Sequence, residues 1–407
     1  MARPDLRRAT PAPRGPREAL VRLRPLLAAA LLACAGTPAA AQAYVIRTGH
    51  VLDVSSMTLQ DGVTLLVENG VVTRRWSGAP PGTLPVGATV VDLSRYTVLP
   101  GLIDAHVHLT LGGPPAENAR RTVEAGFTTV ADLGSAAHQA LRLRARIAAD
   151  SIPGPAIIAA GSWIGGRGGV CEFGGATVRG EEEARSRARA DLAAGASLLK
   201  VCVTGWTETA LAYPDSVELT PGELGAVAAE AAAARVPVAA HAIGQAGALQ
   251  ATRAGARLLA HTPIVDSTAA GVLGRERMCV ASTLATVSEG APRDAAARAL
   301  LRLRAAGARI VVGTDAGVLA HGTNAAELLA LRAIGFGEAE VLRAATVVAA
   351  DCLGLPAGYG ALREGGEASL VAVAENPLLD LTVLQRPAFV MARGRVVVDR
   401  TSTGGRP

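Results

Sequence analysis

Residues 99–109 read Leu-Pro-Gly-Leu-Ile-Asp-Ala-His-Val-His-Leu, a short apolar run that ends in two histidines, His106 and His108. In a strand, side chains alternate between the two faces, so both imidazoles point the same way. Only seven histidines occur in 407 residues, and the preceding Pro-Gly places this pair at the end of a buried strand. We therefore interpret the two histidines as half of a metal site rather than as an incidental pair.

Seven further apolar runs follow, and stretches of helical periodicity separate them. The expected strands after the first are 128–133, 156–160, 198–204, 236–240, 257–261, 279–285 and 309–313. The clearest helical patterns between them are 181–194, 221–234 and 295–306. Eight strand and helix units predict an α/β chain folded as a (β/α)8 TIM barrel, in which the chemistry collects at the carboxyl ends of the strands.

Both ends of the chain differ from the middle in their sequence pattern. Short β-rich runs separated by turn signals fill residues 44–97 and return within residues 363–407. Neither piece has enough strands to be stable alone, so we expect them to share one β domain. The barrel would then occupy residues 98–362.

Six potential metal ligands stand at or near the carboxyl ends of the expected strands: His106, His108, Lys200, His241, His261 and Asp315. Lys200 is the only lysine of the chain and lies in an apolar strand, where an unpaired ammonium would be costly. One interpretation is a buried lysine paired with a carboxylate. The favoured one is that CO2 adds to the amine and gives a carbamate that bridges two metal ions.

These residues, together with Gly-Thr-Asp-Ala-Gly at 313–317 and Asn-Pro-Leu-Leu-Asp at 376–380, resemble the amidohydrolase superfamily. More narrowly, residues 45–398 resemble its imidazolonepropionase-like branch, which includes binuclear metal-dependent dipeptidases. The resemblance implies a barrel with a small β-sandwich made by both termini. It also implies that His106, His108 and Asp315 bind one metal, that His241 and His261 bind the other, and that carbamylated Lys200 bridges them.

The resemblance also implies the chemistry. Two divalent ions, expected to be zinc because of the imidazole-rich ligand set, would lower the pKa of a bridging water and polarise the scissile carbonyl. Asp315 would be the catalytic residue that moves the proton. The loops depart from the family pattern, and the candidate substrate contacts on them are Trp163, Arg167, Trp206, Tyr213 and His321.

We therefore expect a hydrolase that cleaves the amide of a small molecule, a dipeptide or an N-acyl amino acid. The alternative within the superfamily is a mononuclear deaminase or an imidazolone-ring hydrolase, which would not need Lys200 as a bridge. An alternative of another class is a non-catalytic barrel scaffold. The complete ligand set argues against a scaffold, and the sequence leaves open whether the protein forms a homo-oligomer.

The positive charge of the chain is confined to its start. Residues 1–43 hold seven arginines and two acidic residues, whereas the remainder is formally neutral with 33 basic and 33 acidic residues. Nucleic-acid binding is therefore not expected. An apolar run at 26–35 and small residues at 39–43 predict a signal peptide and a secreted or periplasmic protein. A lipoprotein processed at Cys34 is the less favoured route, and no segment reads as a membrane span.

The other four cysteines are widely spaced and form no Cys-x-x-Cys pair: Cys171, Cys202, Cys279 and Cys352. Export would permit disulfides, but so few cysteines in so large a domain are more often buried thiols. Buried thiols are therefore the favoured expectation, and the sequence leaves open whether any of these cysteines pair.

Overall fold

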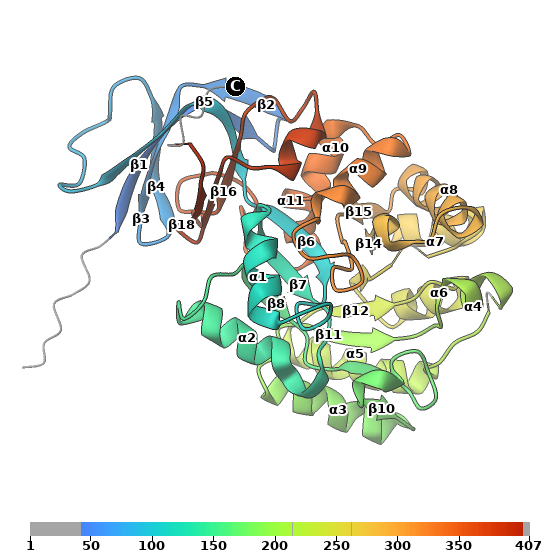
Figure 1. Ribbon diagram of the computed structural model, residues 1–407. Coiled ribbons are helices and arrows are strands. Elements are labelled where there is room, and N and C mark those ends of the chain that lie inside the picture. The colour runs from blue at the N-terminus through green and yellow to red at the C-terminus, as the bar shows by residue number, and fades with distance from the viewer. Residues whose placement is uncertain (1–41, 214, 262, 402–407) are drawn as a thin grey trace, which may run out of the picture. The chain divides into compact units, whose positions relative to one another are not determined.

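A computed structural model describes residues 42–213, 215–261 and 263–401 (Figure 1). The expected signal segment, residues 1–43, lies outside the described residues except for its last two positions. None of the described helices combines the length and the apolar character needed to cross a bilayer.

Strands from both ends of the chain form one eight-stranded sheet. Its order is β18-β17-β16-β5-β1-β3-β4, with β2 paired to β1. The strands are β1 (Ala43–Asp53), β2 (Thr58–Asp61), β3 (Val63–Glu68), β4 (Val71–Ser77), β5 (Thr89–Pro100), β16 (Leu370–Val373), β17 (Phe389–Ala392) and β18 (Arg395–Asp399). The two ends therefore share a sheet, as expected, whereas the two facing layers of a β-sandwich are not shown by the strand pairing.

The middle of the chain supplies the parallel strands, and each of the eight predicted runs overlaps one. They are β6 (Leu102–Val107), β7 (Phe127–Asp132), β8 (Ala156–Ala159), β11 (Leu199–Cys202), β12 (Val238–His241), β13 (Leu258–Leu259), β14 (Cys279–Ala281) and β15 (Arg309–Val311). All pairings between neighbours in this set are parallel. Parallel strands place their carboxyl ends at one edge, and this edge carries the candidate site.

The ladder of these strands is not continuous. They fall into a three-stranded sheet, β6-β7-β8, and a seven-stranded sheet, β10-β9-β11-β12-β13-β14-β15, which includes β9 (Trp163–Gly166) and β10 (Thr177–Val178). Between β15 and β6, backbone hydrogen bonds join Ala105 N to Val312 O and Asp315 N to His106 O. The barrel type predicted from the sequence is thus present as eight successive parallel strands, but not as one closed ladder.

The segment after β8 packs closely against α3. The buried carboxylate of Asp191 accepts hydrogen bonds from the backbone N and the Oγ of Ser162, at 3.2 and 2.7 Å. A Cβ on Gly161 would lie 2.4 Å from the same carboxyl group, so only glycine fits there. Beyond this segment, β9 rather than β8 pairs with β11.

Helices follow most of the parallel strands (Figure 1). They are α1 (Pro115–Glu124), α2 (Gln139–Ala148), α3 (Glu181–Ala193), α4 (Thr207–Ala212), α5 (Pro221–Ala234), α6 (Gln245–Arg253), α7 (Ser267–Arg275), α8 (Ala291–Ala306), α9 (Ala325–Ala333), α10 (Glu338–Ala344) and α11 (Val347–Cys352). The start of α5 matches its prediction: Thr220 is the N-cap, Pro221 is the first helical residue, and Thr220 and Glu223 form a capping box around it.

Gly101 separates the terminal sheet from the first barrel strand. A Cβ at this position would lie 2.0 Å from the Oγ1 of Thr128, so any other residue would force the two segments apart. The Pro-Gly at positions 100 and 101 therefore marks the passage from β5 to β6, immediately before the strand that carries the first two histidines.

The expectation of buried thiols is wrong. The structure pairs Cys171 with Cys202 and Cys279 with Cys352. Widely spaced cysteines gave no sign of this pairing because the fold, not the chain spacing, brings them together. Cys279 lies in β14 and Cys352 ends α11, 73 residues later, so this bond closes a long loop.

We predict that Cys279→Ala/Cys352→Ala lowers the free energy of unfolding by about 4 kcal/mol, because the unfolded chain regains the entropy of a long open loop. Urea denaturation of oxidised protein measures the change. Ser55→Ala, a change of similar size at an exposed position, is the control and should keep the wild-type midpoint. Equal midpoints for the double variant and the oxidised wild type would contradict the prediction.

Candidate metal centre

The six predicted ligands lie at or close to the carboxyl ends of the parallel strands. His106 is in β6 and His108 follows it, Lys200 lies within β11, and His241 ends β12. His261 and Asp315 follow β13 and β15 in the loops. All except the partly exposed His261 are buried, so a ligand here would be largely shielded from water.

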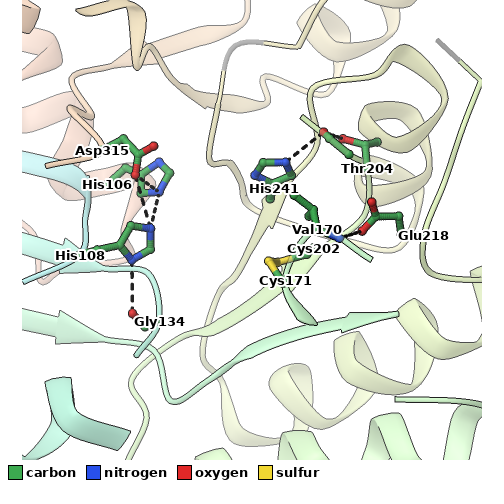
Figure 2. Close-up of a disulfide and its surroundings, with 11 residues drawn as sticks. His106, His108, Gly134, Val170, Cys171, Cys202, Thr204, Glu218, His241 and Asp315 are labelled. Carbon is green, nitrogen blue, oxygen red and sulfur yellow. Dashed lines mark hydrogen bonds and ion pairs between the residues drawn. A yellow bond between two sulfur atoms is a disulfide. The ribbon is translucent and has the colours of Figure 1, made fainter. Parts of the chain in front are cut away.

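His106, His108 and Asp315 form the tightest part of the centre (Figure 2). The Nε2 atoms of the two histidines are 3.3 Å apart, and each lies 3.4 Å from Oδ1 of Asp315. Ligand atoms of the three residues all lie within 4.8 Å of one another. Two imidazole nitrogens and a carboxylate oxygen that converge in this way are a suitable donor set for a divalent metal ion.

The other two histidines continue the cluster. The ring centroids of His241 and His261 are 4.4 Å apart, and the ring of His261 lies 4.7 Å from that of His106. The strand of Lys200, β11, pairs with β12, the strand of His241. Besides burial, the charge of Lys200 lowers the pKa values of all four imidazoles. His106, His108 and Asp315 thus converge, the rings of His241 and His261 continue the cluster, and Lys200 lies in the strand next to that of His241.

Hydrogen bonds to backbone carbonyls orient three of the imidazoles. Nδ1 of His106 donates to Ala260 O, and Nδ1 of His108 donates to Gly134 O at 3.2 Å. His241 instead uses Nε2, which donates to Gly205 O at 3.2 Å. The opposite nitrogen of each ring is left with a free lone pair, as metal ligation requires.

Burial shifts the charges of the centre toward neutrality. It lowers the pKa of His108 and of His241 to about 3, and the pKa values of His106 and His261 fall well below their usual range for the same reason. Burial also lowers the pKa of Lys200 to about 7 and raises that of Asp315 to about 6. Neutral imidazoles with free lone pairs fit a metal site, because protonated rings could not bind an ion.

Asp104, which the sequence analysis did not single out, holds the two sides of the centre together. Its carboxylate accepts hydrogen bonds from Thr314 Oγ1 at 2.6 Å, from Asn324 Nδ2 at 2.8 Å and from the backbone N of His106 at 3.2 Å. It thereby joins β6 to the loop that carries Asp315, whose φ of 53° is unusual for a residue other than glycine. An aspartate inside an apolar run was the available signal.

Glu327 of α9 holds the loop after β14 in a similar way. Its two carboxylate oxygens accept hydrogen bonds from the backbone N of Leu284 at 2.9 Å and of Ala285 at 2.7 Å. The preceding residue, Thr283, has a φ of 40°, and its Oγ1 lies 3.3 Å from Nδ1 of His261. Glu327 therefore positions the neighbour of a candidate ligand.

The five predicted substrate contacts lie in different surroundings. Trp206 lines a pocket beside His261, and its ring lies 5.5 Å from that of His241. Trp163 is buried, 5.5 Å from the ring of His108. Arg167 is exposed and pairs with Glu183, and Tyr213 is also exposed. His321 is buried behind the centre, where Nε2 donates to the carbonyl of His108.

Comparisons with known proteins agree on one family. The model of the amidohydrolase family matches residues 97–397. The ochratoxinase of Aspergillus niger is 32% identical over 230 residues, which cover 52% of this chain and 48% of that protein. The chain thus spans about half the length of this curated relative.

Two further comparisons extend over more of the chain. The imidazolonepropionase of Acidiphilium cryptum is 27% identical over 376 residues, 79% of this chain and 91% of that protein. The crystal structure of a Xaa-Pro dipeptidase with methionine in its active site superposes with a TM-score of 0.79 at 25% identity, covering 87% of this chain and 99% of that chain.

The placement of Glu327 yields a prediction about pH. Burial raises the pKa of its carboxyl from 4.5 to about 7, so the folded protein binds this proton more tightly than the unfolded chain does. The free energy of unfolding should therefore decrease, through this group, as the pH rises from about 4.5 to 7. Urea denaturation at pH 5 and pH 7 should show a smaller loss for Glu327→Gln than for the wild type.

Glu375→Gln, at an exposed position, is the matched control, and its free energy of unfolding should change with pH as that of the wild type does. If the free energies of unfolding of Glu327→Gln and of the wild type change equally between pH 5 and pH 7, the carboxyl of Glu327 does not titrate as described.

Proposed function

The chain belongs to the amidohydrolase family, and we propose that it is a metal-dependent hydrolase that cleaves the amide bond of a dipeptide or an N-acyl amino acid. The observation that carries the proposal is the convergence of four neutral imidazoles, Lys200 and Asp315 at one edge of the parallel strands. The comparisons with an ochratoxinase and a Xaa-Pro dipeptidase support hydrolysis of a carbon–nitrogen bond.

The ligand assignment follows the grouping of the side chains. His106, His108 and Asp315 would hold one divalent ion, His241 and His261 the second, and carbamylated Lys200 would bridge them. We propose zinc, because imidazole-rich sites suit it. When bound, the ions would polarise the scissile carbonyl and lower the pKa of a water molecule at the site.

Asp315 is proposed to move the proton during the reaction. Burial raises the pKa of its carboxyl above its ordinary value, in the direction that favours uptake of a proton. An Oδ atom would take a proton from the attacking water and deliver it to the leaving nitrogen. The backbone hydrogen bond from Asp315 N to His106 O, 2.7 Å long, keeps this carboxylate beside the imidazoles.

Lys200 is suited to carry a carbamate because its amine is buried. Desolvation lowers its pKa to about 7, so an appreciable share of the amine is uncharged near neutral pH. The nitrogen lone pair can then form a bond to the carbon of CO2, and one proton leaves the nitrogen. A bridging carboxylate of this kind supports a binuclear site over the alternatives, a mononuclear deaminase or an imidazolone-type hydrolase.

We also propose export of the protein, with residues 1–43 as the signal peptide. Two disulfides support this, because such bonds persist in the periplasm and outside the cell but are rare in a reducing cytosol. The substrate would then be a small molecule met in one of these compartments.

The proposed activity is tested by a panel of dipeptides and N-acyl amino acids, with release of the amino acid as the measurement. Purified mature protein loaded with zinc should hydrolyse members of this panel, and chelation should abolish turnover because the ions are removed. Turnover of imidazolone or deaminase substrates in place of amides would favour the alternative function. Full activity in chelator would exclude a metal-dependent reaction.

The role of Lys200 is tested by Lys200→Ala. This variant should lose most of the activity and about one of two metal ions per chain, because only the bridging carboxylate is removed. Lys200→Arg should not restore either property, since a guanidinium stays protonated and cannot form a carbamate. Metal content measured by plasma mass spectrometry, together with turnover, gives the answer.

Circular dichroism of Lys200→Ala serves as the control for folding, and short carboxylic acids should partly restore turnover by occupying the vacated space. Retention of two metal ions and near-normal turnover by Lys200→Ala would refute the bridging role.

A further inference from the structure

A small pocket opens beside the candidate metal centre. It has a volume of about 150 Å3, and His261 and Asp315 line it. Apolar side chains form much of the rest of its wall: Trp206, Ile243, Ile264, Val287, Pro292 and Val318. A cavity of about 150 Å3 accommodates one benzene ring, so the pocket has room for a single aliphatic or aromatic side chain.

Glu208 is the one charged side chain of this wall that the metal centre does not use. It lies in α4, after β11, and its side chain is exposed. Within the described part of the chain, its carboxylate has no hydrogen-bond or ion-pair partner, and no arginine or lysine lines the pocket. The pocket therefore combines an apolar surface with an uncompensated negative charge.

We propose that Glu208 binds the free α-ammonium group of the substrate. This inference rests on the proposed amide hydrolysis and narrows the substrates to dipeptides and other aminoacyl amides with an apolar first residue, in preference to N-acyl amino acids. In such a substrate the ammonium-bearing carbon is bonded to the scissile carbonyl. A pocket that extends from Asp315 to Glu208 can hold the first residue with its carbonyl at the metal centre.

Charge also decides which half of the substrate enters this pocket. The carboxylate of a leaving amino acid would face Glu208 in this pocket and be repelled by its like charge. The ammonium of the first residue would instead gain a charge-assisted hydrogen bond. The leaving amino acid is therefore placed outside this pocket.

The test compares two substrates that differ only in the amine: phenylalanyl-alanine and 3-phenylpropanoyl-alanine. With zinc-loaded wild type, kcat/KM for the dipeptide should exceed that for the des-amino compound by about tenfold or more, the value of one hydrogen bond to a charged group. Glu208→Gln should reduce this ratio by about tenfold, mainly through KM. Asp215→Asn removes an exposed charge from the same segment without touching the pocket and should keep the wild-type ratio.

A pH profile adds an independent readout. The preference for the dipeptide should decline above about pH 8, where an α-amino group loses its proton. Calorimetric binding of phenethylamine and 2-phenylethanol tests the pocket without turnover, and Glu208→Gln should weaken only the amine.

The outcomes separate the two proposals. Equal kcat/KM values for both substrates, or an unchanged ratio in Glu208→Gln, would overturn the role of Glu208 while amide hydrolysis stands. No hydrolysis of any amide, with phenethylamine still bound through Glu208, would overturn the proposed function instead.

Discussion

Burial of the Lys200 amine is the constraint on which the rest of the centre depends. A charged ammonium inside a barrel strand would be expensive, and desolvation accordingly lowers its pKa to about 7. The same burial keeps the surrounding imidazoles neutral, so the centre has lone pairs rather than protons to offer. One physical cause, burial, therefore favours the uncharged forms of both the amine and the imidazoles, on which the proposed carbamate and metal ligation depend.

Buried carboxylates build the frame around that centre. Asp104 joins the first barrel strand to the loop of Asp315, and Glu327 holds the backbone beside Thr283. Asp132 fixes the loop after β6, because its carboxylate accepts a hydrogen bond from the backbone N of Leu109 at 2.9 Å. Burial raises the pKa of all three, so the precise placement of the ligands is achieved at some cost in stability near neutral pH.

The sequence predicted those features that local patterns control. Each apolar run overlaps a parallel strand, and the six proposed ligands lie at or near one edge, because residues at strand ends share one edge whatever the intervening loops do. Features that depend on distant partners were missed. The close packing at Gly161 involves Asp191, thirty positions away, and the disulfides join cysteines that only the packed fold brings together. Glu208 was not singled out from the sequence, because the pocket that it lines is formed by several separate loops and helices.

Carbon-13 NMR of the zinc-loaded wild type in labelled bicarbonate, with metal content determined on the same sample, tests for the carbamate on Lys200. One carbamate resonance, absent from Lys200→Ala, and two metal ions per chain are expected. A spectrum without a carbamate resonance, together with a single metal ion per chain, would contradict the binuclear centre built around Lys200.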